Sequence, residues 1–200
     1  WGVVISIWCA VMFGCVVIFF AYDLPPIDKA LSKFRRPTVT LLAADETTLV
    51  RVGEARGAIV RVGDLPTYLP QAITATEDRR FFDHFGIDLI SIVRAMLVNF
   101  QAGRIIQGGS TITQQAAKNL FLSPERTWKR KEQEILLALW LEHNFTKNQI
   151  LTIYLNRVYL GAGSYGVEAA AQKYFGRSAK SITLYQSALL AGLLKAPSRL

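Results

Sequence analysis

Five polar motifs interrupt a stretch of apolar, helix-forming sequence in this chain of 200 residues. In chain order they are residues 75–86 (ATEDRRFFDHFG), 108–119 (GGSTITQQAAKN), 130–134 (RKEQE), 147–156 (KNQILTIYLN) and 165–176 (YGVEAAAQKYFG). From Leu69 onward the apolar residues recur with the helical period, which predicts a mostly α-helical domain. Each motif alone is weak evidence, whereas all five in one helical domain indicate a single site built from several helices.

Capping residues and apolar periodicity locate the expected helices. The main ones cover residues 71–82, 88–100, 111–120 and 127–144. Thr111, Thr146 and Thr183 each precede a glutamine by three residues, which is the capping-box pattern of a helix N-terminus. Ser123 and Pro124 predict one more helix start, because proline is favoured in the first helical position.

The first 22 residues carry no charge. A run of about 20 apolar residues is long enough to cross a bilayer as one helix. A secretory signal peptide would have a shorter apolar core ending in small residues, whereas this run ends in Phe19, Phe20 and Tyr22. We therefore expect a transmembrane anchor over residues 1–22.

The remainder divides into a connector, residues 23–64, and a helical domain, residues 65–200. In the connector, β-branched runs at 38–43 and 48–52 predict two short strands that pair as a hairpin. The chain begins with tryptophan and stops directly after a helix-like run. We therefore expect it to be part of a longer protein.

All charged residues lie after the anchor, so the formal net charge of +8 belongs to the rest of the chain. A basic surface attracts nucleic acid, anionic lipid or a phosphate-bearing substrate. Cys9 and Cys15 both fall in the anchor, and the sequence shows neither a disulfide framework nor a zinc-binding spacing.

The first motif places a carboxylate on an apolar helix face. In the expected helix, Glu77 shares one face with Phe81 and His84, and this face points to the core. A partly desolvated carboxylate is a better proton acceptor near neutral pH, so Glu77 is a candidate general base. The competing interpretation is an ordinary ion pair with Arg79 or Arg80.

A second carboxylate, Glu134, ends a polar stripe formed with Arg126 and Arg130. The next residues, 135–141, are apolar nearly all round, as in a buried helix. A buried carboxylate needs a partner, and Arg130 is one helical turn away. Glu134 is therefore either a site residue or half of an intrahelical ion pair.

A short turn brings Lys118 close to Arg126, and Ser123 with the free N–H groups of a helix start lies between them. Two cations and a helix N-terminus could hold a diphosphate; a solvated basic face is the alternative. Gly108 and Gly109 allow the backbone to approach a ligand closely, or form a simple turn.

The five motifs resemble those of the peptidoglycan glycosyltransferase domain of class A penicillin-binding proteins, over about residues 65–200. The resemblance implies a mostly α, lysozyme-like glycosyltransferase domain, preceded by one transmembrane helix and a short β-containing connector. It implies polymerisation of lipid II, with inversion at the anomeric carbon and release of undecaprenyl diphosphate. The enzyme would be a single-pass protein of the bacterial cytoplasmic membrane, catalytic on its outer side. A transpeptidase domain is expected beyond Leu200.

The resemblance also assigns roles to residues. Glu77 matches the general base that deprotonates the acceptor 4-hydroxyl, and Glu134 the second essential glutamate. The basic residues that would hold the diphosphate are Lys118, Arg126, Arg130 and Lys131. Further cleft residues are Ser110, Gln114, Gln115, Asn119, Asp78, Phe81 and His84. The sequence shows no metal site, although the resemblance permits a divalent cation (Mg or Mn) that Asp78 would help to hold.

The partners implied are lipid II, the growing lipid-linked glycan chain and membrane lipid. Residues 88–106 would dip into the membrane surface, because they present one broad apolar face flanked by Arg94 and Arg104. The alternative for this segment is an ordinary core helix.

Two other functions compete with this one. A lysozyme-like peptidoglycan hydrolase would also use carboxylates in a helical cleft, but it needs neither the aligned cations nor an anchor. A membrane-anchored nucleic-acid or lipid-binding module would not need two glutamates on apolar faces, and the chain lacks a regular basic and aromatic surface pattern. We therefore expect no nucleic-acid partner.

Overall fold

The computed structural model describes residues 1–8, 11–12, 14, 39–42, 48–52, 55–122 and 127–195. Half of the predicted anchor lies outside these ranges, so the anchor stays a prediction. Residues 2–8 are helical. None of the helices within the described ranges has both the length and the apolar character needed to cross a bilayer.

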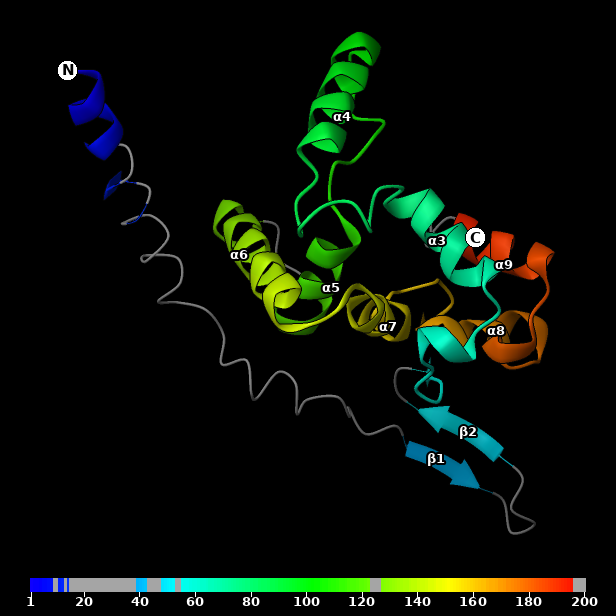
Figure 1. Ribbon diagram of the computed structural model, residues 1–200. Coiled ribbons are helices and arrows are strands. Elements are labelled where there is room, and N and C mark those ends of the chain that lie inside the picture. Colours follow the sequence, from blue (N-terminus) through cyan, green and yellow to red (C-terminus); the bar gives the residue numbers. More distant parts are fainter. Residues whose placement is uncertain are drawn as a thin grey trace.

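Helices make up most of the described chain, which confirms the mostly helical fold class and is consistent with a lysozyme-like domain. They are α3 (Tyr68–Glu77), α4 (Leu89–Ala102), α5 (Ile112–Phe121), α6 (Trp128–Asn144), α7 (Lys147–Arg157), α8 (Val167–Phe175) and α9 (Leu184–Leu193), with the 3-10 helices η1 (Val62–Asp64) and η2 (Ala179–Ser181). Figure 1 shows α4 standing away from the other helices.

Two small sheets accompany the helices. β1 (Val39–Leu42) and β2 (Thr48–Val52) pair antiparallel, as the β-branched runs predict. β3 (Ala55–Arg56) pairs parallel with β4 (Ser164–Tyr165), which the sequence analysis did not predict because a two-residue strand shows no period. The β3–β4 pair brings the end of the connector to the helical domain next to α8.

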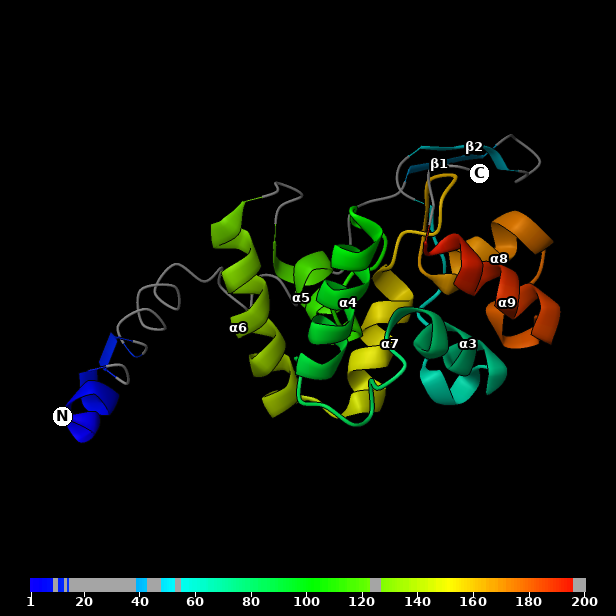
Figure 2. The same ribbon diagram turned by 90° about the horizontal axis from the view of Figure 1, so that it is seen from above.

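The central helix is α5, which lies between α6 and α7 (Figure 2). Its residues Ile112, Ala116 and Ala117 are fully buried. Because alanine side chains are small, both neighbouring helices can approach the backbone of α5 closely. Side chains of α5 therefore face helices on either side of it.

The predicted capping boxes form at Thr146 and Thr183, where threonine and glutamine bond reciprocally. At Thr111 only half of the box forms: its Oγ1 accepts from Gln114 N, but the Gln114 side chain bonds Lys131 instead. The start predicted at residues 123–124 lies outside the described residues.

The prediction that Glu77 shares a helix face with Phe81 and His84 is wrong, because α3 ends at Glu77. The next residue, Asp78, leaves helical geometry. Its carboxylate accepts hydrogen bonds from Ile112 N at 3.0 Å and from His84 Nε2 at 3.0 Å. These contacts hold a turn where local periodicity predicts one more turn of helix.

The ion pair of Lys147 and Glu142 stabilises this turn. Lys147 Nζ lies 2.7 Å from Glu142 Oε1, donates to the backbone oxygen of His84 at 2.6 Å, and stands 4.6 Å from the centre of the Phe81 ring. Thr113 Oγ1 donates to the same Glu142 oxygen at 2.6 Å. The lysine of the fourth motif thus ties the turn after α3 to α5 and α6.

Replacing that lysine should destabilise the protein. In Lys147→Met the carboxylate of Glu142, which is 3% exposed, loses its cation. Removing one partner of a buried pair is strongly destabilising; Lys147 itself is partly exposed, so we expect about 2 kcal/mol less free energy of unfolding. Urea titration followed by circular dichroism measures this.

The matched control is Lys180→Met, which removes an ion pair with Asp64 on the surface. It should leave the unfolding midpoint nearly unchanged. Adding Glu142→Gln to Lys147→Met should recover part of the loss, since the unpaired buried charge is then gone. Equal midpoints for the two lysine variants would show that the buried pair does not stabilise the turn.

Candidate active site

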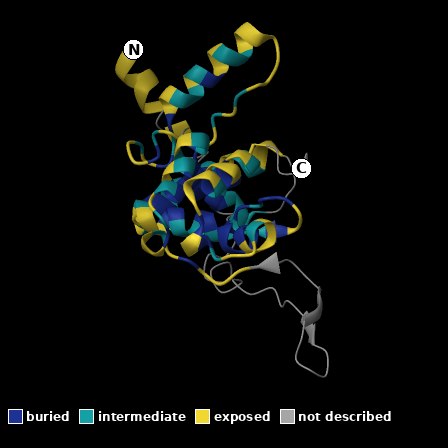
Figure 3. Cartoon of the chain, turned by 90° about the vertical axis from the view of Figure 1, so that its right-hand side faces the viewer, coloured by how far each residue is buried: buried dark blue, intermediate teal, exposed yellow. Residues whose placement is uncertain are grey.

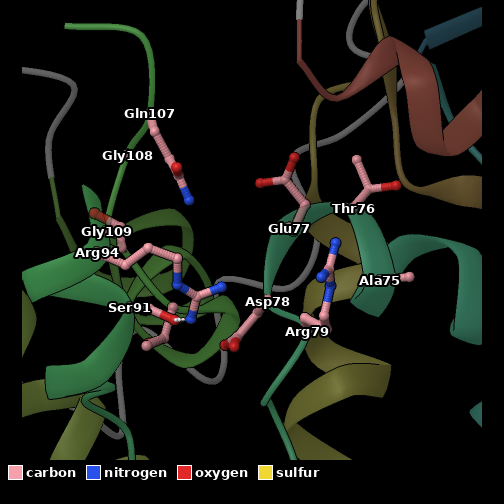
Figure 4. Close-up of a pocket in the computed structure, with 12 residues that line it drawn as sticks. Ala75, Thr76, Glu77, Asp78, Arg79, Ser91, Arg94, Gln107, Gly108 and Gly109 are labelled. Carbon is pink, nitrogen blue, oxygen red and sulfur yellow. Dashed lines mark hydrogen bonds between the residues drawn. The ribbon is translucent and has the colours of Figure 1, made fainter. Parts of the chain in front are cut away.

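A cavity opens at the C-terminal end of α3, facing α4 and the loop before α5 (Figure 4). It is lined by Ala75, Thr76, Glu77, Asp78, Arg79, Ser91, Arg94, Gln107, Gly108, Gly109, Ser110 and Thr111. The first and second motifs therefore meet at one cavity, as a single shared site requires. In Figure 4 the carboxylate of Glu77 extends toward the loop that carries Gln107.

The carboxylate of Glu77 is half-buried and held by a neutral partner. Gln115 Nε2 donates to Glu77 Oε2 at 2.8 Å. The competing ion pair is not formed: Arg79 is exposed, and Arg80 lies 3.8 Å from Asp88 instead. Within the described part of the chain, Glu77 Oε1 has no hydrogen-bond partner, so one oxygen is available to a ligand.

The second carboxylate, Glu134, is 4% exposed and neutralised by two cations. Arg130 Nη1 lies 3.2 Å from its Oε2, which confirms the predicted intrahelical pair, and Lys131 Nζ lies 2.7 Å from its Oε1. Lys131 also donates to Ser110 Oγ at 3.0 Å and to Gln114 Oε1 at 3.2 Å. Because Ser110 lines the cavity, Lys131 connects Glu134 to its rim.

Two successive residues of α5 link it to the two carboxylates, one directly and one through a lysine. Gln115 contacts Glu77 on α3, and Gln114 contacts Lys131, the partner of Glu134 on α6. Neighbouring positions of a helix point about 100° apart, so one helix can serve both sides. The glutamine pair of the second motif thereby joins the first motif to the third.

The expected diphosphate site is only partly described. Lys118 is half-buried in the last turn of α5, and its ammonium group has no hydrogen-bond or ion-pair partner among the described residues. Asn119 beside it is also half-buried. Ser123 and Arg126 lie outside the described residues, so the proximity of Lys118 to Arg126 stays a prediction.

Phe81 and His84, expected in the cleft, do not line this cavity. Phe81 is fully buried in the core, and His84 pairs with Asp78. Both side chains hold the turn after Glu77. Asp78 lines the cavity, but it is buried and both its oxygens already accept N–H bonds, from His84 and Ile112.

These bonds make Asp78 a poor metal ligand, since a divalent cation would have to displace them. Across the described residues, no group of three or more His, Cys, Asp or Glu side chains could hold a metal ion. The described residues therefore form no preformed cage of protein ligands for the divalent cation that the family resemblance permits.

Two cations of the cavity were not expected there. Arg79 and Arg94 both line it, and Arg94 Nη2 donates to Ser91 Oγ at 2.9 Å. Arg79 belongs to the first motif, so its position two residues after Glu77 was an available signal. Arg94 lies on α4, which carries no motif, and only the fold brings it to the cavity.

Comparison with known proteins identifies relatives over nearly the whole chain. A family model described as Transglycosylase matches residues 45–200. Penicillin-binding protein 1A of Aquifex aeolicus (strain VF5) is 45% identical over 199 residues, which are 99% of this chain and 27% of that protein. Penicillin-binding protein 1A of Escherichia coli (strain K12) is 42% identical over 195 residues, 95% of this chain and 23% of that protein. The chain thus spans roughly a quarter of the length of these curated relatives.

Proposed function

The chain belongs to the transglycosylase family, the peptidoglycan glycosyltransferase domain of class A penicillin-binding proteins, and we propose that it polymerises lipid II into glycan strands. The membership predicted from the five motifs is confirmed. In the proposed reaction the acceptor 4-hydroxyl oxygen bonds to the anomeric carbon of the donor chain with inversion. The bond from that carbon to the diphosphate breaks, and its electrons leave with undecaprenyl diphosphate.

The position of Glu77 carries this proposal. Its carboxylate lines a cavity, has one oxygen held by Gln115, and forms no ion pair within the described residues. Such a carboxylate can accept the proton of the acceptor hydroxyl as the new bond forms. Glu134, by contrast, is buried between two cations, which suits a residue that organises the basic side of the site.

The diphosphate leaving group needs positive charge nearby, and the lysine and arginine residues of the site supply it. As the bond to the anomeric carbon breaks, negative charge grows on the diphosphate, and preorganised cations stabilise it. The ammonium group of the half-buried Lys118 has no hydrogen-bond or ion-pair partner among the described residues. We assign it to the diphosphate together with Arg126, while Lys131 and Arg130 form the adjoining basic wall against Glu134.

Incubation of the protein with purified lipid II, followed by separation of polymer from monomer, tests the proposal directly. We expect lipid-linked glycan strands and free undecaprenyl diphosphate. The alternative, a lysozyme-like hydrolase, predicts the opposite pair of results: no polymer from lipid II, and soluble fragments released from purified peptidoglycan.

The proposed substrate lies in a membrane, and α4 supports contact with lipid. Leu89, Met96 and Phe100 on α4 are exposed, as are Ile105 and Ile106 in the following loop. A core helix would bury such residues, yet only Ala95 of α4 is buried (Figure 3). An apolar surface of this extent is typical of a membrane or protein contact.

We therefore propose that α4 and its loop sit in the bilayer surface, beside the anchor predicted at residues 1–22. The catalytic domain would then lie on the outer side of the bacterial cytoplasmic membrane. There the cavity opens near the head groups, where the diphosphate of a polyprenyl substrate is held.

A protein beginning after Tyr22 should consequently still sediment with anionic liposomes. Ile105→Asp combined with Ile106→Asp should weaken this binding by at least about tenfold, because two exposed isoleucines no longer enter lipid. Ile59→Asp changes an exposed isoleucine elsewhere and serves as the matched control. Should the shortened protein remain wholly in the supernatant at low salt, α4 makes no membrane contact.

A further inference from the structure

The Gln115 side chain bridges the candidate base to a residue that no substrate can reach. Its Nε2 donates to Glu77 Oε2 at 2.8 Å, and its Oε1 accepts from the hydroxyl of Tyr154 at 3.4 Å. Tyr154 lies on α7 and is fully buried, whereas Gln115 is half-buried on α5. Three motifs, the first, second and fourth, are thus joined in one line of hydrogen bonds.

The groups at the two ends determine which atom donates and which accepts in each of these hydrogen bonds. A carboxylate can only accept, so the amide must turn its NH₂ group toward Glu77. The amide oxygen then faces Tyr154, whose hydroxyl is free to donate to it. Burial, with smaller contributions from the carboxylates of Glu77 and Asp78, raises the pKa of Tyr154, so the hydroxyl keeps its proton and remains a donor.

The surroundings make this line rigid. Helix α5 packs against α7, and the two helices carry buried core residues such as Ala116 and Leu151, so the positions of Gln115 and Tyr154 are fixed relative to each other. Glu77, by contrast, is the last residue of α3 and lines the cavity, and within the described residues its carboxylate has Gln115 as its only hydrogen-bond partner. A carboxylate at such a position needs an external contact to hold one rotamer.

We propose that Tyr154 and Gln115 are positioning residues for the base: Tyr154 orients the Gln115 amide, and the amide holds one oxygen of Glu77 so that the other faces the acceptor hydroxyl. This inference rests on the proposed function. It also changes the role of Gln115, which the family resemblance places in the cleft as a substrate contact. A positioning residue and a substrate contact differ in which kinetic constant they alter.

Steady-state polymerisation of lipid II separates the two roles. Gln115→Ala should lower kcat roughly tenfold to a hundredfold with little change in KM, because ionised Glu77 loses its donor. Tyr154→Phe keeps the buried ring and removes only the hydroxyl, so kcat should fall by about threefold to tenfold. The double variant should be no slower than Gln115→Ala alone, since Tyr154 acts through the amide.

Tyr174→Phe is the matched control. Its hydroxyl donates to the Leu160 backbone oxygen at 2.9 Å, away from the cavity, so its loss should leave kcat unchanged. Thermal melts establish whether each variant is folded. If Tyr154→Phe does not fold, Gln115→Ala still tests whether the Gln115 amide positions Glu77. A raised KM with normal kcat in Gln115→Ala, or additive losses in the double variant, overturns the proposal.

The wild-type protein and the Tyr154→Phe variant test the proposed function and the positioning role separately. A wild-type protein that leaves lipid II unpolymerised overturns the proposed function, and the positioning role with it. An active wild type whose Tyr154→Phe variant matches the Tyr174→Phe control overturns the positioning role alone.

Discussion

Glu77→Gln should abolish most polymerisation of lipid II while leaving the protein folded. Glutamine keeps the size of the side chain, yet it cannot accept a proton from the acceptor hydroxyl. A positioned general base contributes roughly 10²–10⁴ to a rate, and we expect kcat to fall within that range. Within the described residues, the Glu77 side chain has only the Gln115 amide as a hydrogen-bond partner, so the thermal midpoint should barely move.

Glu132→Gln provides the comparison, since Glu132 is an exposed glutamate on α6. It carries the same change of charge and should polymerise lipid II at the wild-type rate. Binding of lipid II should survive in both variants, because the cations proposed to hold the diphosphate are intact. A folded Glu77→Gln protein that turns over normally would remove Glu77 from the role of base.

The elements that the sequence predicted well are those set by neighbouring residues. Thr146 and Thr183 cap their helices because the partner glutamine is three residues away, and no distant contact competes for it. The Arg130–Glu134 pair forms for the same reason, at one helical turn. In the structure Glu77 and Ser110 line one cavity, and Lys131 of the third motif donates to Ser110.

The local structures that the sequence predicted wrongly are those in which a residue contacts another residue far along the chain. The turn after Glu77 replaces a helical turn because Asp78 bonds Ile112, 34 residues away. The Gln114 side chain does not complete the capping box, because its oxygen accepts a hydrogen bond from Lys131 on the next helix. The line from Glu77 through Gln115 to Tyr154 spans separations of 38 and 39 residues, which no periodicity reveals.

Lys118→Ala should cause the second largest loss of activity. Each preorganised charge at a developing oxyanion is worth about 3 kcal/mol, so kcat should fall by about a hundredfold. Stability should not change with it, because the ammonium group of Lys118 has no hydrogen-bond or ion-pair partner among the described residues. That combination, a slow but fully stable variant, distinguishes a cation reserved for substrate from one that holds the fold.

The matched control is Lys173→Ala, which removes a lysine from the last turn of another helix, α8. It alters net charge equally and should leave the rate unchanged. Arg126→Ala should resemble Lys118→Ala, and Arg126→Lys should not fully restore activity, since an ammonium lacks the guanidinium fork. Measuring kcat on lipid II and on a soluble short-chain analogue separates chemistry from membrane attachment. If Lys118→Ala lost only liposome binding and kept its full rate on the soluble analogue, Lys118 would belong to the membrane surface and the diphosphate would need another cation.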